Sequence, residues 1–337
     1  MEVEVDGTRW SLTTASSPPL DLGAAVAHTG GMPPTEPGEG PGGELGQESG
    51  ITFLRRTPAL PGVAAVYGYA GVEAGSRSRR PPHRGVPSTL LTVVVAVDAP
   101  LLCSATLEEW ADHRGETHAV CLGGFHLQPV YLQRPDAQEG VQVAVHPLAA
   151  RRLLGLPASA LTELTQEGGG VLGPSMRRLH ERVVSSPPAE RPLLVEEALS
   201  ALASRHERRQ GPRREVVGAW RLLERSGGRM RVTDTASAVG LTSRHLSSLM
   251  KAELGIGTKE LADLMRFESA HSELVERARR GAAPRLADLA HTHGYADHAH
   301  LDRAYRRFAG TSPTEWLAEE FRNIQAGGHA PARDSSP

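Results

Sequence analysis

Two stretches in the C-terminal part of the chain repeat one another, and this repeat constrains the fold more than any other feature of the sequence. The first copy runs from Ala236 to Gly255 and the second from Ala290 to Gly310. With one extra residue in the second copy, the small, glycine and large apolar residues recur in the same order. The aligned pairs are Ala236 with Ala290, Gly240 with Gly294, Leu246 with Leu301, Met250 with Tyr305, and Gly255 with Gly310. No strand pattern interrupts them, so the repeat predicts two copies of one helical unit.

Each copy has the pattern of two short helices joined by a tight turn. Gly240 or Gly294 stands just after the first helix, where a positive φ is needed. Thr242 or Asp297 follows, where a side-chain oxygen caps the second helix. Apolar residues at helical spacing predict a buried face on each second helix, and the opposite face is polar. This is the pattern of a helix-turn-helix unit, whose second helix enters a DNA major groove.

The region from about 213 to 321 resembles the DNA-binding domain of AraC/XylS-type regulators, in which a long helix joins two helix-turn-helix units. It covers about a third of the chain. The joining helix corresponds to Lys259–Arg279. The first copy departs from the family at Ser248, where the family often has Arg, and at Thr258, where it often has Pro. The second copy carries the motifs Leu289-Ala290, Gly294-Tyr295-Ala296-Asp297, His300-Leu301, Arg303, Tyr305-Arg306-Arg307-Phe308 and Gly310-Thr311-Ser312-Pro313.

The resemblance implies a set of DNA-contacting positions on the two second helices. Lys251 and Arg306 are expected to contact phosphates, and arginines at base-facing positions can read guanine bidentately. Asp302 is expected to accept from cytosine N4 or to orient Arg303. The two helices are expected in successive major-groove turns on one side of the DNA, about 34 Å apart. The complete predicted surface comprises Thr242, Arg244, His245, Ser247, Ser248, Lys251, Asp297, His298, Ala299, Asp302, Arg303 and Arg306.

The segment before the repeat alternates between strand and helix patterns. The β-branched run Leu90–Val97 predicts a buried strand, and the alternation in Val141–Val145 predicts a strand with one buried face. Further expected strands are Val63–Tyr69 and His118–Leu122, and the expected short helices are Pro147–Leu156, Leu161–Leu164 and Met176–Val184. More weakly, this part resembles a regulatory domain of some actinobacterial-type members of the same family, through His83–Ser88, Gly140–Val143 and Pro147–Ala150. In that family, N-terminal domains sense small molecules or dimerise.

We therefore predict an α+β N-terminal domain followed by an all-α double helix-turn-helix domain. Residues 1–50 and 326–337 are expected to be disordered, because segments rich in Gly, Pro, Glu and Ser cannot bury enough apolar surface to order themselves. Between them we expect the α+β regulatory or dimerisation domain over 51–190, a linker helix over 191–212, and the DNA-binding domain over 213–321.

The charge distribution permits nucleic-acid binding by the C-terminal part. Residues 211–325 hold 18 Lys and Arg against 15 Asp and Glu, within a chain whose net charge is −2. This mildly basic region follows an acidic N-terminal part. Such an asymmetry is compatible with DNA as a partner but does not establish it.

Several residues outside the repeat carry chemistry that we weighed against plain structural roles. Cys103 and Cys121 have no zinc spacing and are expected as buried apolar residues, with a redox pair as the alternative. The histidines His291, His293, His298 and His300 are expected to pack or to contact the groove rather than to bind zinc. No metal or cofactor is predicted. Arg84 and Ser88 are candidates for an effector pocket, where Arg84 would bind an anion; the alternative is a solvated loop.

The function predicted from these features is a sequence-specific DNA-binding transcriptional regulator. The alternatives are a protein-interaction module and an enzyme with a helical appendage. The sequence has no nucleophile elbow, phosphate-binding loop or zinc-protease motif, so we expect no enzyme. Promoter DNA is the expected partner, and RNA polymerase, a small-molecule effector and a second copy of the chain are compatible with the layout. The apolar run Leu90–Val97 is too short to span a bilayer, so we expect no membrane partner. Cys103 and Cys121 form no CxxC pair, so we expect a reduced, cytoplasmic setting.

Overall fold

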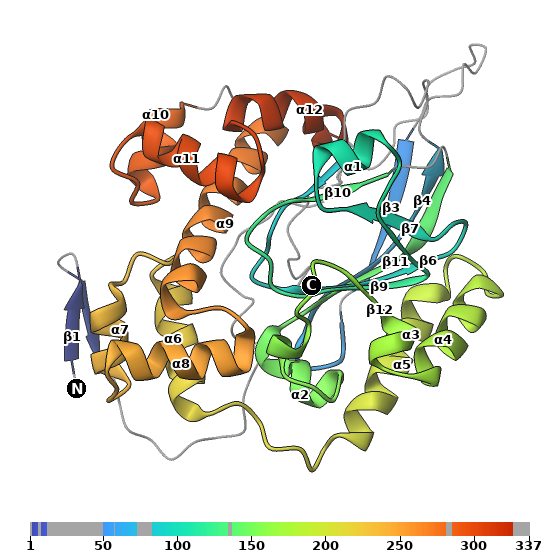
Figure 1. Ribbon diagram of the computed structural model, residues 1–337, viewed down its shortest axis with the longest axis horizontal. Coiled ribbons are helices and arrows are strands. Elements are labelled where there is room, and N and C mark those ends of the chain that lie inside the picture. The colour runs from blue at the N-terminus through green and yellow to red at the C-terminus, as the bar shows by residue number, and fades with distance from the viewer. Residues whose placement is uncertain are drawn as a thin grey trace.

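The computed structural model describes residues 2–5, 8–11, 50–56, 58–72, 83–133, 137–280 and 285–325. A β-rich part comes first in the chain and a helical part follows, and the two lie side by side (Figure 1). The short strand expected near Val3–Trp10 is a pair of antiparallel strands, β1 (Glu2–Val5) and β2 (Thr8–Ser11). The rest of the expected disordered segment 1–50, apart from Gly50, and the whole of 326–337 lie outside the described residues.

The larger sheet has six antiparallel strands in the order β12-β9-β6-β11-β4-β3. Its centre is formed by β6 and β11, where Val95 pairs with Val141 and Val93 pairs with Val143. These β-branched residues are buried, as expected for residues that pack well on a pleated surface. The strands are β3 (Gly50–Arg56), β4 (Val63–Val72), β6 (Leu91–Ala96), β9 (Val120–Gly123), β11 (Ala137–Val145) and β12 (Gln166–Glu167).

A second, four-stranded antiparallel sheet has the order β5-β10-β7-β8. Its strands are β5 (His83–Gly85), β7 (Leu101–Ser104), β8 (Glu116–His118) and β10 (Val130–Leu132), and helix α1 (Leu107–Ala111) follows β7. The prediction of one strand over His118–Leu122 is wrong, because β8 and β9 belong to different sheets. The chain changes sheet at Ala119, whose N–H donates to the Glu167 carboxylate at 2.9 Å.

Short helices complete the N-terminal part. They are η2 (Pro147–Ala149), α2 (Ala150–Leu153), η3 (Ala158–Ala160), α3 (Gly168–Val171), α4 (Pro174–Val184) and α5 (Arg191–Arg205). The helix expected over Leu161–Leu164 is wrong, because these residues are irregular. Leu161 is buried against the backbone of Gly124, so a tertiary contact rather than a helical face accounts for its apolar character.

The linker helix expected over residues 191–212 divides into two parts. Helix α5 ends at Arg205 and packs on α2, α4, β4 and β11, so it is built into the N-terminal part (Figure 1). The residues from 206 to 213 are not helical and form the connection to the C-terminal part. Among the described helices, none is long and apolar enough to cross a bilayer.

The C-terminal part is helical and is organised around one long helix, α9 (Thr258–Arg279), which contacts helices of both repeats. Phe267 of α9 is fully buried, and its ring packs edge-on against Tyr305 and at a tilt against Phe308 of the second repeat. The helices on either side of α9 are α6 (Arg214–Arg225), α7 (Val232–Ala238), α8 (Ser243–Leu254), α10 (Leu286–Thr292), α11 (His298–Phe308) and α12 (Pro313–Gln325). The observed fold is thus the expected one: an α+β domain followed by an all-α domain.

Candidate nucleic-acid interface

The first repeat forms a helix-turn-helix unit from α7 and α8. Gly240 has a φ of +74°, which a residue with a side chain rarely adopts, and it ends the turn after α7. Thr242 then caps α8 by accepting a hydrogen bond from the His245 amide at 3.2 Å. Leu246 and Met250 are fully buried on one side of α8. The glycine, the cap and the apolar spacing of this copy therefore have the roles predicted for them.

The opposite side of α8 carries the predicted DNA-contacting residues. Arg244, His245, Ser248 and Lys251 are exposed, and Ser247 is half-buried. The Ser248 hydroxyl donates to the Arg244 carbonyl at 3.0 Å, so it is held along the helix. The guanidinium of Arg244 makes no ion pair with any residue that the structure describes. Arg244 stays a predicted contact to a base edge.

The second repeat forms the same unit from α10 and α11. Gly294 has a φ of +71°, and Asp297 caps α11 by accepting from the His300 amide at 2.7 Å. Leu301, Tyr305 and Phe308 are buried on the inner side of α11. The two units thus share one construction despite the extra residue in the second turn.

The outer side of α11 presents four exposed residues and one that is half-buried. His298, Ala299, Arg303 and Arg306 are exposed, and Asp302 is half-buried. Asp302 forms an ion pair with Arg306, one turn later, at 2.8 Å between Oδ2 and Nε. Within the described part of the chain, Arg303 forms no ion pair. Asp302 therefore orients Arg306 rather than Arg303 here, and both arginines face outward.

The four histidines of the second unit take separate roles. His293 hydrogen-bonds Glu273 of α9 at 2.7 Å, and His300 packs edge-on against the Tyr295 ring at a centroid distance of 5.1 Å. His291 and His298 are exposed. These positions match the expected packing role of His300 and leave His298 free to approach a groove.

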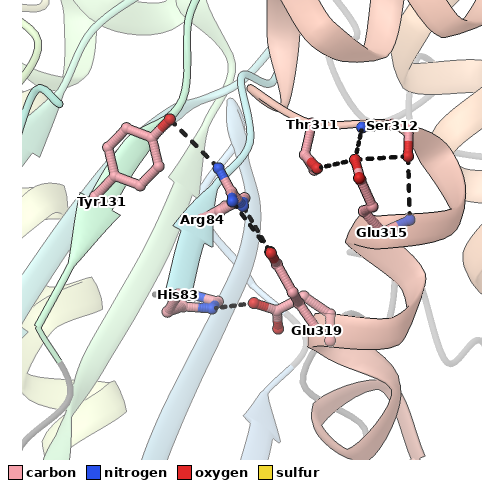
Figure 2. A network of polar contacts seen from close by, with 8 residues as sticks. His83, Arg84, Tyr131, Thr311, Ser312, Glu315 and Glu319 are labelled. Carbon is pink, nitrogen blue, oxygen red and sulfur yellow. Dashed lines mark hydrogen bonds and ion pairs between the residues drawn. The ribbon is translucent and has the colours of Figure 1, made fainter. Parts of the chain in front are cut away.

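Arg84 of β5 attaches the N-terminal part to α12, the helix that follows the second unit (Figure 2). Its guanidinium donates to the Glu319 carboxylate of α12 at 2.6 Å and 3.1 Å, and also reaches the Tyr131 hydroxyl at 3.4 Å. Burial by itself would lower the pKa of Arg84, but the bond to Glu319 raises the pKa above its ordinary value. The neighbouring His83 lies 3.0 Å from the Glu320 carboxylate. Together these contacts hold α12 against the smaller sheet.

Hydrogen bonds to the Glu315 carboxylate stabilise the start of α12. The Glu315 carboxylate accepts from the Ser312 amide at 3.0 Å and from the hydroxyls of Thr311 and Ser312, both at 2.8 Å (Figure 2). These hydrogen bonds, that of the Ser312 amide first, lower the pKa of Glu315 to about 2. The helix that carries Glu319 thus begins at a well-satisfied cap.

Two further contacts attach the N-terminal part to the first unit and to α9. Arg151 of α2 forms a two-pronged ion pair with Glu253 near the end of α8, at 2.8 Å and 3.0 Å. The Glu268 carboxylate of α9 accepts from the Ser88 hydroxyl at 2.7 Å and from the Thr89 amide at 3.2 Å. Contacts from one domain therefore reach α8, α9 and α12.

The residues considered for an effector pocket, Arg84 and Ser88, both lie in this boundary between the two parts of the chain. Their partners, Glu319 and Glu268, were not singled out in the sequence, and neither were Arg151 and Glu253. These four residues carry no local motif, since an isolated charged residue on a helix is usually solvated. Only the packing of the two domains pairs them.

Comparison with known proteins supports the C-terminal assignment. Residues 235–319 match the family model described as a helix-turn-helix domain, and the match runs from α7 into α12. It confirms the expected AraC-type helix-turn-helix region and supports a DNA-binding regulator of transcription. No curated protein sequence matches the chain significantly.

Solved structures of ToxT from Vibrio cholerae are similar to this chain over most of its length. One structure at 1.65 Å resolution is 10% identical, with 81% of this chain and 99% of that chain covered and a TM-score of 0.42. A ToxT structure with bound unsaturated fatty acid is 10% identical, with coverages of 80% and 94% and a TM-score of 0.41. ToxT of strain O395 is 8% identical, with coverages of 81% and 97% and a TM-score of 0.40.

Proposed function

We propose that this chain, whose residues 235–319 form an AraC-type helix-turn-helix domain, is a sequence-specific regulator that binds promoter DNA through both recognition helices, α8 and α11. The observation that carries the proposal is the shared construction of the two units. Each has a capped second helix whose apolar side is buried and whose basic side is exposed. Each of these exposed sides carries an arginine, Arg244 or Arg303, without an ion-pair partner among the described residues.

Each of the two helices carries one residue that we assign to base reading and one that we assign to phosphate contact. An arginine guanidinium donates two parallel hydrogen bonds to guanine O6 and N7, which distinguishes a G·C pair in the major groove. Arg244 and Arg303 are the residues that we assign to this role. Lys251 and Arg306 are assigned to phosphates, which fix the position of the protein on the duplex without reading sequence.

We further propose that the N-terminal domain controls DNA binding by setting the position of the two helix-turn-helix units relative to one another. Its contacts end on Glu253 of α8, Glu268 of α9 and Glu319 of α12, while the predicted DNA-contacting arginines and lysine of α8 and α11 stay exposed. A change in these contacts would therefore shift the units relative to one another rather than uncover them. Coupling of about 1–3 kcal/mol, or 5–150-fold in affinity, is typical of such control.

The experiment that tests DNA binding is selection from random double-stranded DNA with the full chain, followed by a salt titration on the selected site. A regulator should enrich one motif, and its affinity should fall steeply with salt because bound phosphates release counterions. The spacing and symmetry of the motif would report whether one chain or two bind. The matched control is Arg178→Ala on α4, an exposed arginine far from both units, beside Arg303→Ala.

No enrichment by the full chain would contradict the proposal and favour the protein-interaction module. Control by the N-terminal domain is tested separately with Arg84→Ala. We expect its affinity for the two-unit site to change at least about fivefold, while its affinity for a single-unit site is unchanged. Equal affinities for both sites in wild type and variant would contradict the control mechanism but leave DNA binding intact.

A further inference from the structure

Two cysteines and a histidine from three strands meet in the interior of the N-terminal domain. They are Cys103 of β7, His118 at the end of β8, and Cys121 of β9, and one ligand-type atom of each lies within 4.8 Å of the others. All three side chains are buried, with exposed fractions of 3–5%. Among the described residues, this is the only group of three or more His, Cys, Asp and Glu side chains with spacing that suits a metal ion.

The two-sheet topology builds this cluster. Cys103 pairs with Glu116 in the four-stranded sheet, and Cys121 pairs with Val94 in the six-stranded sheet. The chain crosses from one sheet to the other at Ala119, which brings His118 beside both thiols. The cluster therefore lies where the two sheets meet, and an ion held there would link them.

The surroundings of His118 match those of a metal-ligating histidine. Its Nε2 is 2.9 Å from the Thr165 hydroxyl. Its Nδ1 is 3.9 Å from the Glu167 carboxylate and forms no hydrogen bond with the described residues, although it is buried. Glu167 is held in place by the amides of Ala119 and Gly169, at 2.9 Å and 3.2 Å. Histidines that ligate metals commonly donate their other N–H to a carboxylate placed in this way.

We propose that Cys103, His118 and Cys121 bind one thiophilic metal ion, with Zn²⁺ as the ion that fits best. Zinc takes thiolate sulfur at about 2.3 Å and imidazole nitrogen at about 2.0–2.1 Å, so the three side chains need to close by only about 1 Å to ligate one ion. Both thiols lose their protons on binding. Two thiolates and a neutral imidazole then balance the +2 charge of the ion, which limits the penalty for burying it.

The fourth position of a tetrahedral zinc would be taken by the Thr165 hydroxyl or by water. A catalytic zinc keeps such an open position, whereas a structural zinc is usually closed by a fourth protein ligand.

Neither the proposal nor its test depends on DNA binding. The competing use of the same residues is a reversible disulfide between Cys103 and Cys121, which are both free thiols in this structure. The Glu167 carboxylate beside Nδ1 of His118 favours the metal, because a metal-ligating histidine commonly has such a carboxylate beside its other nitrogen, whereas a disulfide needs neither group.

The test uses the full chain, reduced and freed of metal with a chelator, and titrated with Zn²⁺ against a chromophoric competitor. We expect one ion bound per chain. Titration with Co²⁺ should give the intense near-ultraviolet absorption of thiolate-to-cobalt charge transfer and the strong visible bands of a four-coordinate ion. Cys121→Ser and His118→Asn should weaken Zn²⁺ binding at least about 100-fold, and Glu167→Gln should weaken it about 10–100-fold.

His113→Asn is the matched control, because His113 is an exposed histidine of the same domain with a φ of +53°, which asparagine tolerates. Its Zn²⁺ affinity should equal that of wild type. If a variant fails to fold, the Co²⁺ spectrum of the wild-type chain still decides the question, since only thiolate ligation gives the charge-transfer band. A spectrum without that band, or His118→Asn binding as tightly as wild type, would overturn the proposal. So would quantitative disulfide formation in a chain that retains no zinc.

Discussion

Arg84 on the edge strand β5 and Glu319 on α12 form a two-pronged ion pair across the boundary between the β-rich and helical domains (Figure 2). The Arg84 side chain is 6% exposed and that of Glu319 is 24% exposed. The pair is therefore asymmetric: the cation is buried, and the carboxylate still reaches water. This asymmetry has measurable consequences.

Removing Glu319 should destabilise the protein more than removing Arg84. Glu319→Ala leaves a buried guanidinium whose remaining partner among the described residues is the Tyr131 hydroxyl, and we expect a loss of about 2–3 kcal/mol in the free energy of unfolding. Arg84→Ala leaves a carboxylate that water can solvate, so its loss should be smaller. Urea unfolding of both variants and of the double variant measures the coupling. Arg114→Ala, in the exposed pair with Asp112, is the control and should change stability by less than about 1 kcal/mol. Equal losses for Glu319→Ala and Arg84→Ala would contradict the asymmetry.

Two arginines of α11 should differ in what they contribute to DNA binding. Arg303→Ala should lose about 1–3 kcal/mol on the selected site and relax the preference at one base position. Arg306→Ala should weaken binding to all sequences alike and reduce the salt dependence by about one phosphate contact. Quantitative binding to the selected site and to single-base variants of it, at several salt concentrations, separates the two roles. Uniform losses for Arg303→Ala would make Arg303 a phosphate contact.

Two glycines with the same backbone conformation should respond differently to alanine. Gly240 and Gly228 have φ values of +74° and +72°. A Cβ at Gly240 would meet no atom within 4 Å, whereas one at Gly228 would lie 2.0 Å from the Ala262 carbonyl oxygen. Gly240→Ala should therefore show only the backbone strain of about 1–2 kcal/mol. Gly228→Ala should add the clash with α9 and lose more than about 3 kcal/mol or fail to fold. Similar melting temperatures for the two variants would show that α9 does not approach Gly228 this closely.

Acid should weaken the packing around His146. Burial first, and the nearby charge of Arg221 second, lower the pKa of His146 from 6.5 to about 4, and its ring lies 5.0 Å from that of Trp220 on α6. Because the unfolded chain binds the proton more tightly, the contribution of His146 is complete above pH 6.5 and is lost as the pH falls toward 4. Between pH 7 and pH 5 we expect a loss of about 2 kcal/mol in unfolding free energy. His146→Asn keeps an acceptor for the Leu148 amide but does not titrate.

The measurement for His146 is the difference in unfolding free energy between wild type and His146→Asn across this pH range. Other groups titrate in both proteins, and the difference removes them. A constant difference from pH 7 to pH 4 would mean that His146 has the same pKa in the folded and unfolded chain.

The parts of this protein that were predictable are those specified by residues close together in the chain. Gly240, Thr242 and Leu246 lie within seven residues of one another, and their conformation, capping bond and burial follow from helix geometry and from the freedom of glycine at positive φ. The same holds for Gly294, Asp297 and Leu301. Short apolar runs without such punctuation were predicted less well. The segment Leu161–Leu164 has only four residues, so its apolar pattern is too short to distinguish a helix from a buried irregular segment.

The sequence by itself therefore determined the two helix-turn-helix units and the order of the domains, because backbone preference and apolar period are local properties. Only the tertiary structure decided which charged and nucleophilic side chains meet. Arg84 and Glu319 are 235 residues apart, and Cys103 reaches Cys121 only because β8 and β9 enter different sheets. When two partner side chains are far apart in the sequence, the residues next to one of them do not indicate the other. The pairing is set by how the sheets and helices pack, and that packing minimises exposed apolar surface over the whole chain.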